Sequence, residues 1–207
     1  MLFWRRRKVV SFLVSGRGLL FSSVAEKIIN HDIPARIGCV ITDNASAQVL
    51  LRARSMKVPA YHVDPDAYSG QHGYEMAMLR LLDDRRTDLI VAAGYLRLLS
   101  ARFVGRYCNR IINIHPSLLP SFPGLHSQRQ ALAHGVKITG CTAHFIDEGI
   151  DTGPVIMQSP VMVIENDTEE SLSRRILQEE CRVIAESVRL FCEERLTVTG
   201  KKVIRRT

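Results

Sequence analysis

Hydrophobic and polar positions follow two different rhythms along the first half of the chain. Short runs rich in valine and isoleucine, typical of buried strands, alternate with longer segments whose apolar positions recur every three or four residues. The predicted strands are 8–14, 35–42, 58–63, 88–93 and 110–115. The predicted helices are 22–30, 47–57 and 73–82. This βαβ order predicts an α/β fold, doubly wound, with a mostly parallel sheet and helices on both faces.

The pattern changes after His115. A stretch rich in proline and glycine, 116–124, predicts an ordered but irregular connection. The elements predicted beyond it are a helix at 127–133, strands at 139–146 and 154–163, and a helix from Asp167 to about Phe191. No interdomain linker or repeat interrupts the chain. We therefore expect one domain, 1–207, with a nucleotide-binding half at about 8–115 and a second half at about 116–191.

The chain has 207 residues, of which 46% are hydrophobic, so it can bury a sizeable core. Its net charge of +7 is concentrated in two basic tails, 1–7 and 194–207, which we expect to be solvated. Between the tails the charges are mixed, and no basic stripe is interleaved with aromatic residues. The sequence therefore predicts no nucleic-acid partner, and at most a mild attraction for anionic substrates.

Five cysteines, without a CxxC pair, fit reduced thiols in a cytoplasmic protein better than a disulfide framework. The apolar run 9–14 is too short for a secretory signal, and no run approaches the length of a membrane span. No P-loop, HExxH motif or zinc cluster is present. Cys141 and His144 lack partners at zinc spacing, so we expect them in the core or shaping a site, and we expect no metal.

A glycine turn, Gly16-Arg17-Gly18, follows the first predicted strand. Such a turn can present backbone N–H groups to a phosphate at a helix N-terminus, or it can simply connect a strand to a helix. A dinucleotide fingerprint would require a third glycine where Phe21 stands, so we reject that type of cofactor site.

Two polar residues, Asn113 and His115, stand at the carboxyl end of a predicted buried strand, the edge where parallel sheets bind ligands. Strand alternation places them on one side, where an amide and an imidazole could stabilise an oxyanion, or could merely satisfy a turn. Acidic residues crowd the later loop 147–151, including Asp151. A carboxylate there could act on a histidine or only bind water, and spacing alone does not pair Asp151 with His115.

Four segments together resemble the folate-dependent formyltransferases. They are NIHPSLLP at 113–120, FPGL at 122–125, TGCTAHF at 139–145 and DTGP at 151–154. The resemblance extends from about Lys8 to Phe191. The stretch 121–131 favours the branch that acts on phosphoribosylglycinamide over the branch that formylates methionyl-tRNA, which carries an additional domain.

The resemblance implies transfer of a formyl group from 10-formyltetrahydrofolate to the amine of 5-phosphoribosylglycinamide in purine synthesis, without a metal. It implies that Asn113 binds the formyl oxygen, His115 polarises it, and Asp151 sets the charge of His115. The implied folate-binding residues are Leu96, Arg97, Leu99, Val104, Phe145 and Asp147. The implied acceptor and phosphate residues are Gly16, Arg17, Gly18, Leu19, Leu20, Pro116 and Glu180.

The acceptor end departs from the family pattern. Leu19-Leu20 replaces a polar pair, Leu177 a lysine or polar residue, and 181–185 a run beginning with histidine. Gln71 stands near the place of a family arginine. These departures keep three alternatives open: another small amine or amino sugar as acceptor, deformylation by water, and a non-catalytic folate-binding homologue. The expected partners are small molecules, in a monomer or homodimer.

Overall fold

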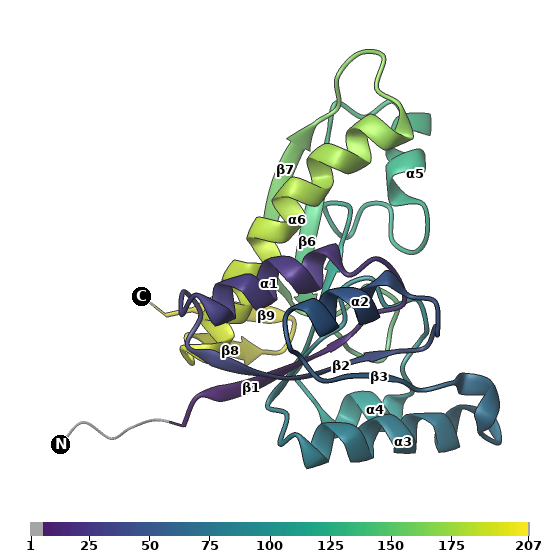
Figure 1. Cartoon of the computed structure of the whole chain (residues 1–207). Coiled ribbons are helices and arrows are strands. Elements are labelled where there is room, and N and C mark those ends of the chain that lie inside the picture. The colour runs from purple at the N-terminus through teal and green to yellow at the C-terminus, as the bar shows by residue number, and fades with distance from the viewer. Residues whose placement is uncertain (1–5, 207) are drawn as a thin grey trace.

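The computed structural model describes residues 6–206, and it is built on one nine-stranded sheet in the order β3-β2-β1-β4-β5-β6-β7-β9-β8 (Figure 1). The strands are β1 (Lys8–Leu13), β2 (Ala35–Thr42), β3 (Ala60–His62), β4 (Leu89–Val91), β5 (Ile111–His115), β6 (Ile138–Phe145), β7 (Val155–Met162), β8 (Leu196–Thr199) and β9 (Lys202–Arg205). The helices are α1 (Leu19–Ile29), α2 (Gln48–Ser55), α3 (Gly70–Asp84), α4 (Ala101–Arg106), α5 (Ser127–Ala133) and α6 (Glu169–Cys192), with a 3-10 turn, η1, at Pro65–Ala67.

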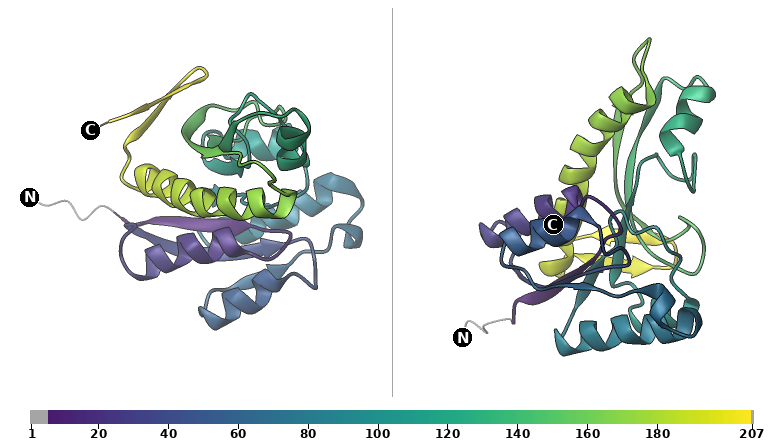
Figure 2. Two further views of the ribbon diagram at one scale, coloured as in Figure 1. Left: turned by 90° about the horizontal axis from the view of Figure 1, so that it is seen from above. Right: turned by 45° about the vertical axis from the view of Figure 1, so that its right-hand side comes forward.

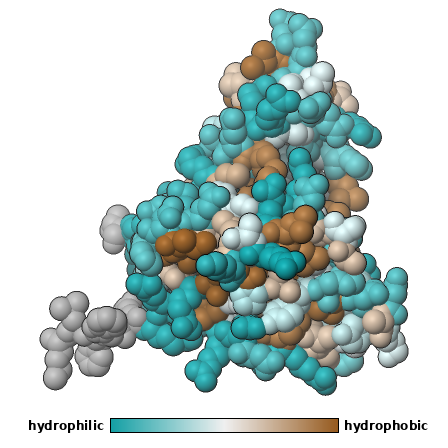
Figure 3. Space-filling model, viewed as in Figure 1, coloured by the Kyte–Doolittle hydropathy of each residue, from teal (hydrophilic) through white to brown (hydrophobic). Residues whose placement is uncertain are grey.

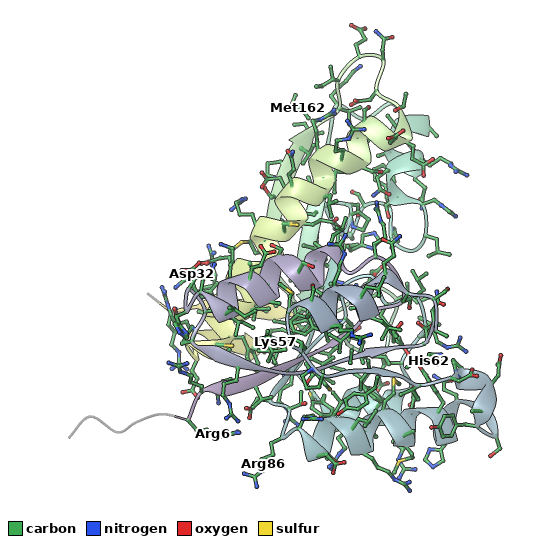
Figure 4. All side chains as sticks on the ribbon, in the orientation of Figure 1. Arg6, Asp32, Lys57, His62, Arg86 and Met162 are labelled. Atoms are coloured by element: carbon green, nitrogen blue, oxygen red, sulfur yellow. The ribbon has the colours of Figure 1, made fainter. Side chains whose placement is uncertain are left out.

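Strands β1 to β5 are parallel, and their order reverses direction at β1. In Figure 4, Asp32, which precedes β2, and His62, which ends β3, mark the amino and carboxyl ends of these strands. Sheets of this type commonly bind ligands at the carboxyl ends of the strands, at the point where the strand order reverses, which here lies between β1 and β4. The predicted doubly wound, mostly parallel fold is confirmed.

Both faces of the parallel half are covered, which explains why its strands read as continuous apolar runs. Helices α1, α2 and α6 cover one face, and α3 and α4 cover the other (Figure 1). Within β1, Val10 and Phe12 belong to the first core cluster and Leu13 to the second. The single strand therefore contributes to two hydrophobic cores.

The second half of the chain extends the sheet rather than forming a separate body. Strand β6 runs antiparallel to both β5 and β7, and β6 and β7 project beyond the parallel half with α5 (Figure 2). Helix α6 starts at a capping box between Thr168 and Ser171 and returns to pack beside α1. One core cluster therefore joins Phe12 and Val24 to Ile176 and Val183.

Helix α1 begins at Leu19, three residues before the predicted start at Ser22, because Gly18 in a left-handed conformation (φ 73°) already ends the turn. The helix α4 was not predicted. Its six residues include Gly105 and are too few to establish a helical period.

The basic residues of the C-terminal segment from Lys201 to Arg206 are exposed, as expected of solvated charges, but the segment is an ordered part of the fold rather than a tail. Residues 196–205 form the β8–β9 hairpin, which turns at Gly200 (φ 58°) and joins β7 through the pairing of Val155 with Lys202. Apolar residues of the hairpin pack against the first core cluster: Leu196, Val198 and Val203. Of the N-terminal tail, residues 1–5 lie outside the described part, and Arg6 bonds to Asp88 at 2.6 Å.

The molecular surface is mostly hydrophilic on the face shown in Figure 3, with small separate apolar patches. Across residues 6–206, no helix combines the length and apolar character that crossing a membrane requires. All five cysteines are free thiols.

Candidate active site

The end of β5 places Asn113 and His115 on one side of the sheet, as strand alternation predicts. Asn113 pairs in register with His144 of β6, and His115 pairs with Thr142. Ile114, between them, is buried in the first core cluster. Asn113 is partly exposed at this edge, so its amide is accessible to a ligand.

Asp151 reaches this edge from the loop between β6 and β7. Its Oδ2 lies 3.2 Å from Nδ1 of His115 and accepts a hydrogen bond from the Gly124 amide at 2.8 Å. Asp151 itself has a left-handed backbone (φ 54°), which is uncommon for a residue with a side chain. The expected convergence of His115 and Asp151, which 36 positions separate (151 − 115), is confirmed.

The side chain of His115 is only 5% exposed. While Nδ1 faces Asp151, Nε2 lies 2.8 Å from the Phe122 carbonyl oxygen and 2.9 Å from the Ser127 hydroxyl. A ring protonated on both nitrogens can therefore donate to an oxygen on each side. In this conformation the Phe122 carbonyl and the Ser127 hydroxyl both contact Nε2.

His144 connects Asn113 to the carboxylate. Its Nδ1 lies 3.0 Å from the Phe145 carbonyl oxygen, its Nε2 3.3 Å from Nδ2 of Asn113, and 3.7 Å from Asp151. Burial lowers the pKa of His144, which favours the neutral ring. A neutral ring that donates from Nδ1 accepts from the Asn113 amide at Nε2, and so orients that amide. Cys141 and His144 were expected in the core or shaping a site; Cys141 is fully buried in the core, and His144 is buried beside Asn113.

Sequence reasoning missed three groups around His115: the Ser127 hydroxyl, the Phe122 carbonyl and the Gly124 amide. Phe122 and Gly124 have left-handed backbones, at φ 53° and 79°. Glycine and proline indicated an irregular stretch here, but no residue pattern specifies which backbone groups such a stretch directs toward a side chain.

The glycine turn leads directly into α1. Gly18 is the N-cap and makes no side-chain capping bond. The Ser22 amide bonds the Gly18 carbonyl at 3.0 Å, so the amides before it lie at the open end of the helix. Arg52 holds the turn by a 2.8 Å bond from Nε to the Arg17 carbonyl. The Arg17 side chain is exposed and makes no hydrogen bond or ion pair with any other described residue.

The two leucines of the turn differ in their surroundings. Leu20 packs against the first core cluster, and Leu19 is partly exposed at the helix end. Leu20 therefore contributes its amide rather than its side chain to this helix end, while Leu19 adds apolar surface there.

Glu180 on α6 is a buried acid, 9% exposed. Burial raises its pKa to about 7, and its carboxyl group has no hydrogen-bond or ion-pair partner within residues 6–206. Leu177, one turn earlier on the same helix, and Pro116, after β5, are each partly buried. An isolated buried carboxyl suits a ligand that supplies hydroxyl or amine donors.

A cavity of about 680 Å³ lies beside the segment Leu96–Leu98, after β4. Leu96 and Leu98 are 75% and 70% exposed, and the Arg97 guanidinium lies 5.7 Å from the centre of the Tyr74 ring. Further lining residues are Pro65, Asp66, Tyr68, Gly70 and Gln71. The cavity thus combines apolar and aromatic surface with a cation.

The remaining residues implied for folate binding differ in accessibility. Leu99 is partly buried against the second core cluster, while Val104 and Phe145 are buried at 6% and 1% exposure. The Phe145 ring packs in the core against Phe191. Asp147 lies in the β6–β7 loop and remains accessible. No group of three or more potential metal ligands occurs within residues 6–206.

A family model described as formyl transferase matches residues 7–188. This chain belongs to the formyl transferase family. Its match covers every element from β1 to most of α6, and therefore both halves of the expected domain.

Curated relatives of this family member include single-activity and multifunctional proteins. Phosphoribosylglycinamide formyltransferase of Bacillus subtilis is 36% identical over 169 residues, 82% of this chain and 87% of that protein. The trifunctional purine biosynthetic protein adenosine-3 of Drosophila melanogaster is 41% identical over 174 residues. That match covers 83% of this chain but 13% of the trifunctional protein.

Solved structures of the family match closely. Glycinamide ribonucleotide transformylase 1 from Symbiobacterium toebii is 44% identical, with a TM-score of 0.97 over 100% of this chain and 98% of that one. A formyltetrahydrofolate deformylase from Pseudomonas syringae is 28% identical, with a TM-score of 0.91 over 98% of this chain and 67% of that one.

Proposed function

We propose that this chain transfers the formyl group of 10-formyltetrahydrofolate to the amine of 5-phosphoribosylglycinamide, as a cytoplasmic enzyme of purine synthesis. The observation that carries the proposal is the meeting of Asn113, His115 and Asp151 at the carboxyl edge of the sheet, in a chain of this family. A protein that only binds folate has no need for a carboxylate, an imidazole and an amide within one hydrogen-bonded group.

The chemistry assigned to these residues is stabilisation of a tetrahedral intermediate. The acceptor nitrogen bonds to the formyl carbon, the bond from that carbon to the folate N10 breaks, and the proton lost by the amine ends on N10. Asn113, oriented by His144, donates to the oxygen as it becomes an oxyanion. His115 donates from Nε2 once Phe122 releases it, and Asp151 stabilises the charged imidazole.

The cavity beside Leu96–Leu98 fits a folate in size and chemistry. Small-molecule sites commonly have volumes of roughly 300–1,000 Å³ and combine apolar walls with a few polar groups. Leu96 and the Tyr68 ring offer exposed apolar surface to ring systems, and Arg97 offers a cation to the carboxylates of the glutamate tail.

The acceptor would extend from the catalytic edge to the glycine turn. The open amides of α1 suit a phosphate, and Arg17 is free to add a charged contact. Glu180 suits the hydroxyl groups of a ribose. The Leu19 side chain can give the phosphate no hydrogen bond, so we expect affinity to depend on the backbone amides and Arg17.

An acceptor screen tests the function directly. The enzyme is supplied with 10-formyltetrahydrofolate and one amine at a time, and release of tetrahydrofolate and formylated amine is measured. We expect release that depends on phosphoribosylglycinamide and equals the amount of formylated product. Glycinamide without the ribose phosphate is the matched control and should support little turnover. If tetrahydrofolate release depended on a different amine, phosphoribosylglycinamide would not be the acceptor, although formyl transfer itself would stand.

Deformylation is the second candidate, and the apolar Leu19 at the phosphate end of the site is the observation that favours it. In that reaction, water takes the place of the amine and the products are formate and tetrahydrofolate. The same screen distinguishes the two functions, because a deformylase releases tetrahydrofolate without any amine.

A further inference from the structure

The turn of the C-terminal hairpin reaches the loop that carries Asp151. Lys201, between β8 and β9, places its ammonium group 2.7 Å from Oδ2 of Asp147 and 2.8 Å from the Thr152 carbonyl oxygen. More than 45 residues separate Lys201 from either partner along the chain. The contact therefore joins two remote segments directly beside the candidate catalytic carboxylate.

Asp147 connects the two ends of this loop. Its Oδ1 accepts hydrogen bonds from the Thr152 hydroxyl at 2.7 Å and from the Gly149 amide at 3.1 Å, while Oδ2 accepts from Lys201. Burial disfavours the ionised carboxyl, but the bonds from Lys201, Thr152 and Gly149 outweigh it and lower the pKa of Asp147. The carboxylate is thus charged and fully engaged at neutral pH.

The loop is tightly folded around Asp151. A side chain at Gly149 would come within 2.1 Å of the Thr152 hydroxyl, and one at Gly153 within 1.7 Å of the Phe145 carbonyl oxygen. Asp151 keeps a left-handed backbone between these points. A residue with a side chain holds that conformation only when its surroundings stabilise it. Lys201 contacts the carbonyl of the next residue, Thr152.

Lys201 is itself held by an ordered element. Strand β9 pairs with β7 at Val155, and apolar residues of the hairpin pack against the core. The Lys201 side chain is 70% exposed, so its contribution comes from the position of its charge rather than from burial. A cation fixed at this place favours the loop conformation in which Asp151 meets His115.

We propose that Lys201 is a positioning residue for formyl transfer, which clamps the loop 147–152 so that Asp151 faces His115. This inference rests on the proposed function for its kinetic part, but the clamp itself is a property of the loop. Lys201 was expected to be one of the solvated charges of the C-terminal tail; its side chain is exposed, and its contacts assign it a defined role in addition.

The test compares Lys201→Met with Lys202→Met. The two variants lose the same charge at adjacent positions, and the Lys202 side chain makes no hydrogen bond or ion pair within residues 6–206. We expect Lys201→Met to lower kcat about two- to fivefold, the scale of an exposed pair, with little change in KM for either substrate. High salt should reduce this difference. In an Asp147→Asn background, Lys201→Met should lower kcat by a smaller factor, because the main hydrogen-bond acceptor of Lys201 is already weakened.

A second measurement does not depend on the substrate. Amide hydrogen exchange of the segment 147–153 in the free enzyme should be faster in Lys201→Met than in wild type and unchanged in Lys202→Met. Equal exchange and equal kcat in the two variants would overturn the proposal. If the wild type showed no formyl transfer at all, the proposed function would fail, and the exchange experiment would still decide whether Lys201 holds the loop.

Discussion

Among single residues, His115 carries the proposed catalytic role. Removing one preorganised donor to an oxyanion commonly lowers turnover by about 100- to 1,000-fold. We expect His115→Ala to lose kcat on this scale while folate binding, measured by calorimetry, stays close to wild type. Thermal unfolding of the variant serves as the control, because the ring is buried. Near-normal turnover in a folded variant would make His115 a structural residue and remove the proposed mechanism.

Glu180 provides a pH-dependent prediction with a defined sign. Burial raises its pKa from 4.5 to about 7, so the folded protein holds this proton more tightly than the unfolded chain does. The contribution of Glu180 to the free energy of unfolding is therefore fully present below about pH 4.5 and is lost as pH rises through about 7. Glu180→Gln cannot ionise and should exceed wild type by up to about 3 kcal/mol near pH 8, with little difference near pH 4.5. Urea unfolding at the two pH values measures this.

The adjacent acid is the control for that experiment. Ser159 and Arg182 lower the pKa of Glu179 by hydrogen bonds to its carboxylate. At high pH, Glu179→Gln should therefore be less stable than wild type, the opposite of Glu180→Gln. If Glu180→Gln gained no stability as pH rises, its carboxyl group would have a partner or solvent access that the structure does not show.

Sequence predicted part of the candidate site at this scale. Strand alternation was enough to place Asn113 and His115 together, because side-chain direction in a strand has a fixed period. The pairing of Asp151 with His115 followed only from the family resemblance. Ser127 could not be identified, because its contact with His115 depends on the backbone of the preceding loop.

At the scale of elements, the turn between β1 and α1 requires glycine at one position. A side chain at residue 18 would come within 2.5 Å of Cγ2 of Val49, and φ is 73° there. At Gly16, nothing lies within 4 Å of an added Cβ. We expect Gly18→Ala to destabilise the protein by at least about 2 kcal/mol, combining overpacking with the left-handed backbone. Gly16→Ala should be near neutral, and equal losses in urea unfolding would refute this account.

The same turn carries the acceptor prediction. We expect phosphoribosylglycinamide to bind the Arg17→Ala variant about 10-fold or more weakly than wild type. This factor is the scale of a charged hydrogen bond. Calorimetry with the Leu19→Ser, Leu20→Asn double variant is the comparison. Binding that appears only in the double variant would indicate another natural acceptor. Tight binding that is insensitive to Arg17 would mean that the phosphate lies elsewhere.

Most elements of the fold were predictable, and the exceptions have physical causes. Buried parallel strands such as β1 and β2 are marked by continuous apolar runs, and α6 by its cap and long apolar period. The hairpin β8–β9 was missed although β8, Leu196–Thr199, is rich in β-branched residues, because the two strands are short and in β9 the two apolar residues stand between Lys202 and Arg205. Its strand character depends on pairing with β7, a contact that local sequence does not contain.

At the scale of the whole molecule, the two halves share one architecture. The sheet continues from β5 to β6 without a break, and α6 from the second half packs beside α1 from the first. The proposed catalytic edge therefore combines β5 with the β6–β7 loop, and the proposed acceptor region combines the glycine turn with Glu180 of α6. The proposed active site requires both halves in one arrangement.

This shared core makes the domain assignment testable. Because Phe12, Val24, Ile176 and Val183 belong to one cluster, residues 8–115 and 116–191 should unfold together. Small single domains show one transition, with equal calorimetric and van't Hoff enthalpies. We expect a single transition in scanning calorimetry. A folate analogue should raise its midpoint, because ligand binding to the native state stabilises the whole unit that unfolds cooperatively with the binding site. Two transitions, only one of which responded to the ligand, would show that the halves are separate units and that the core cluster does not couple them.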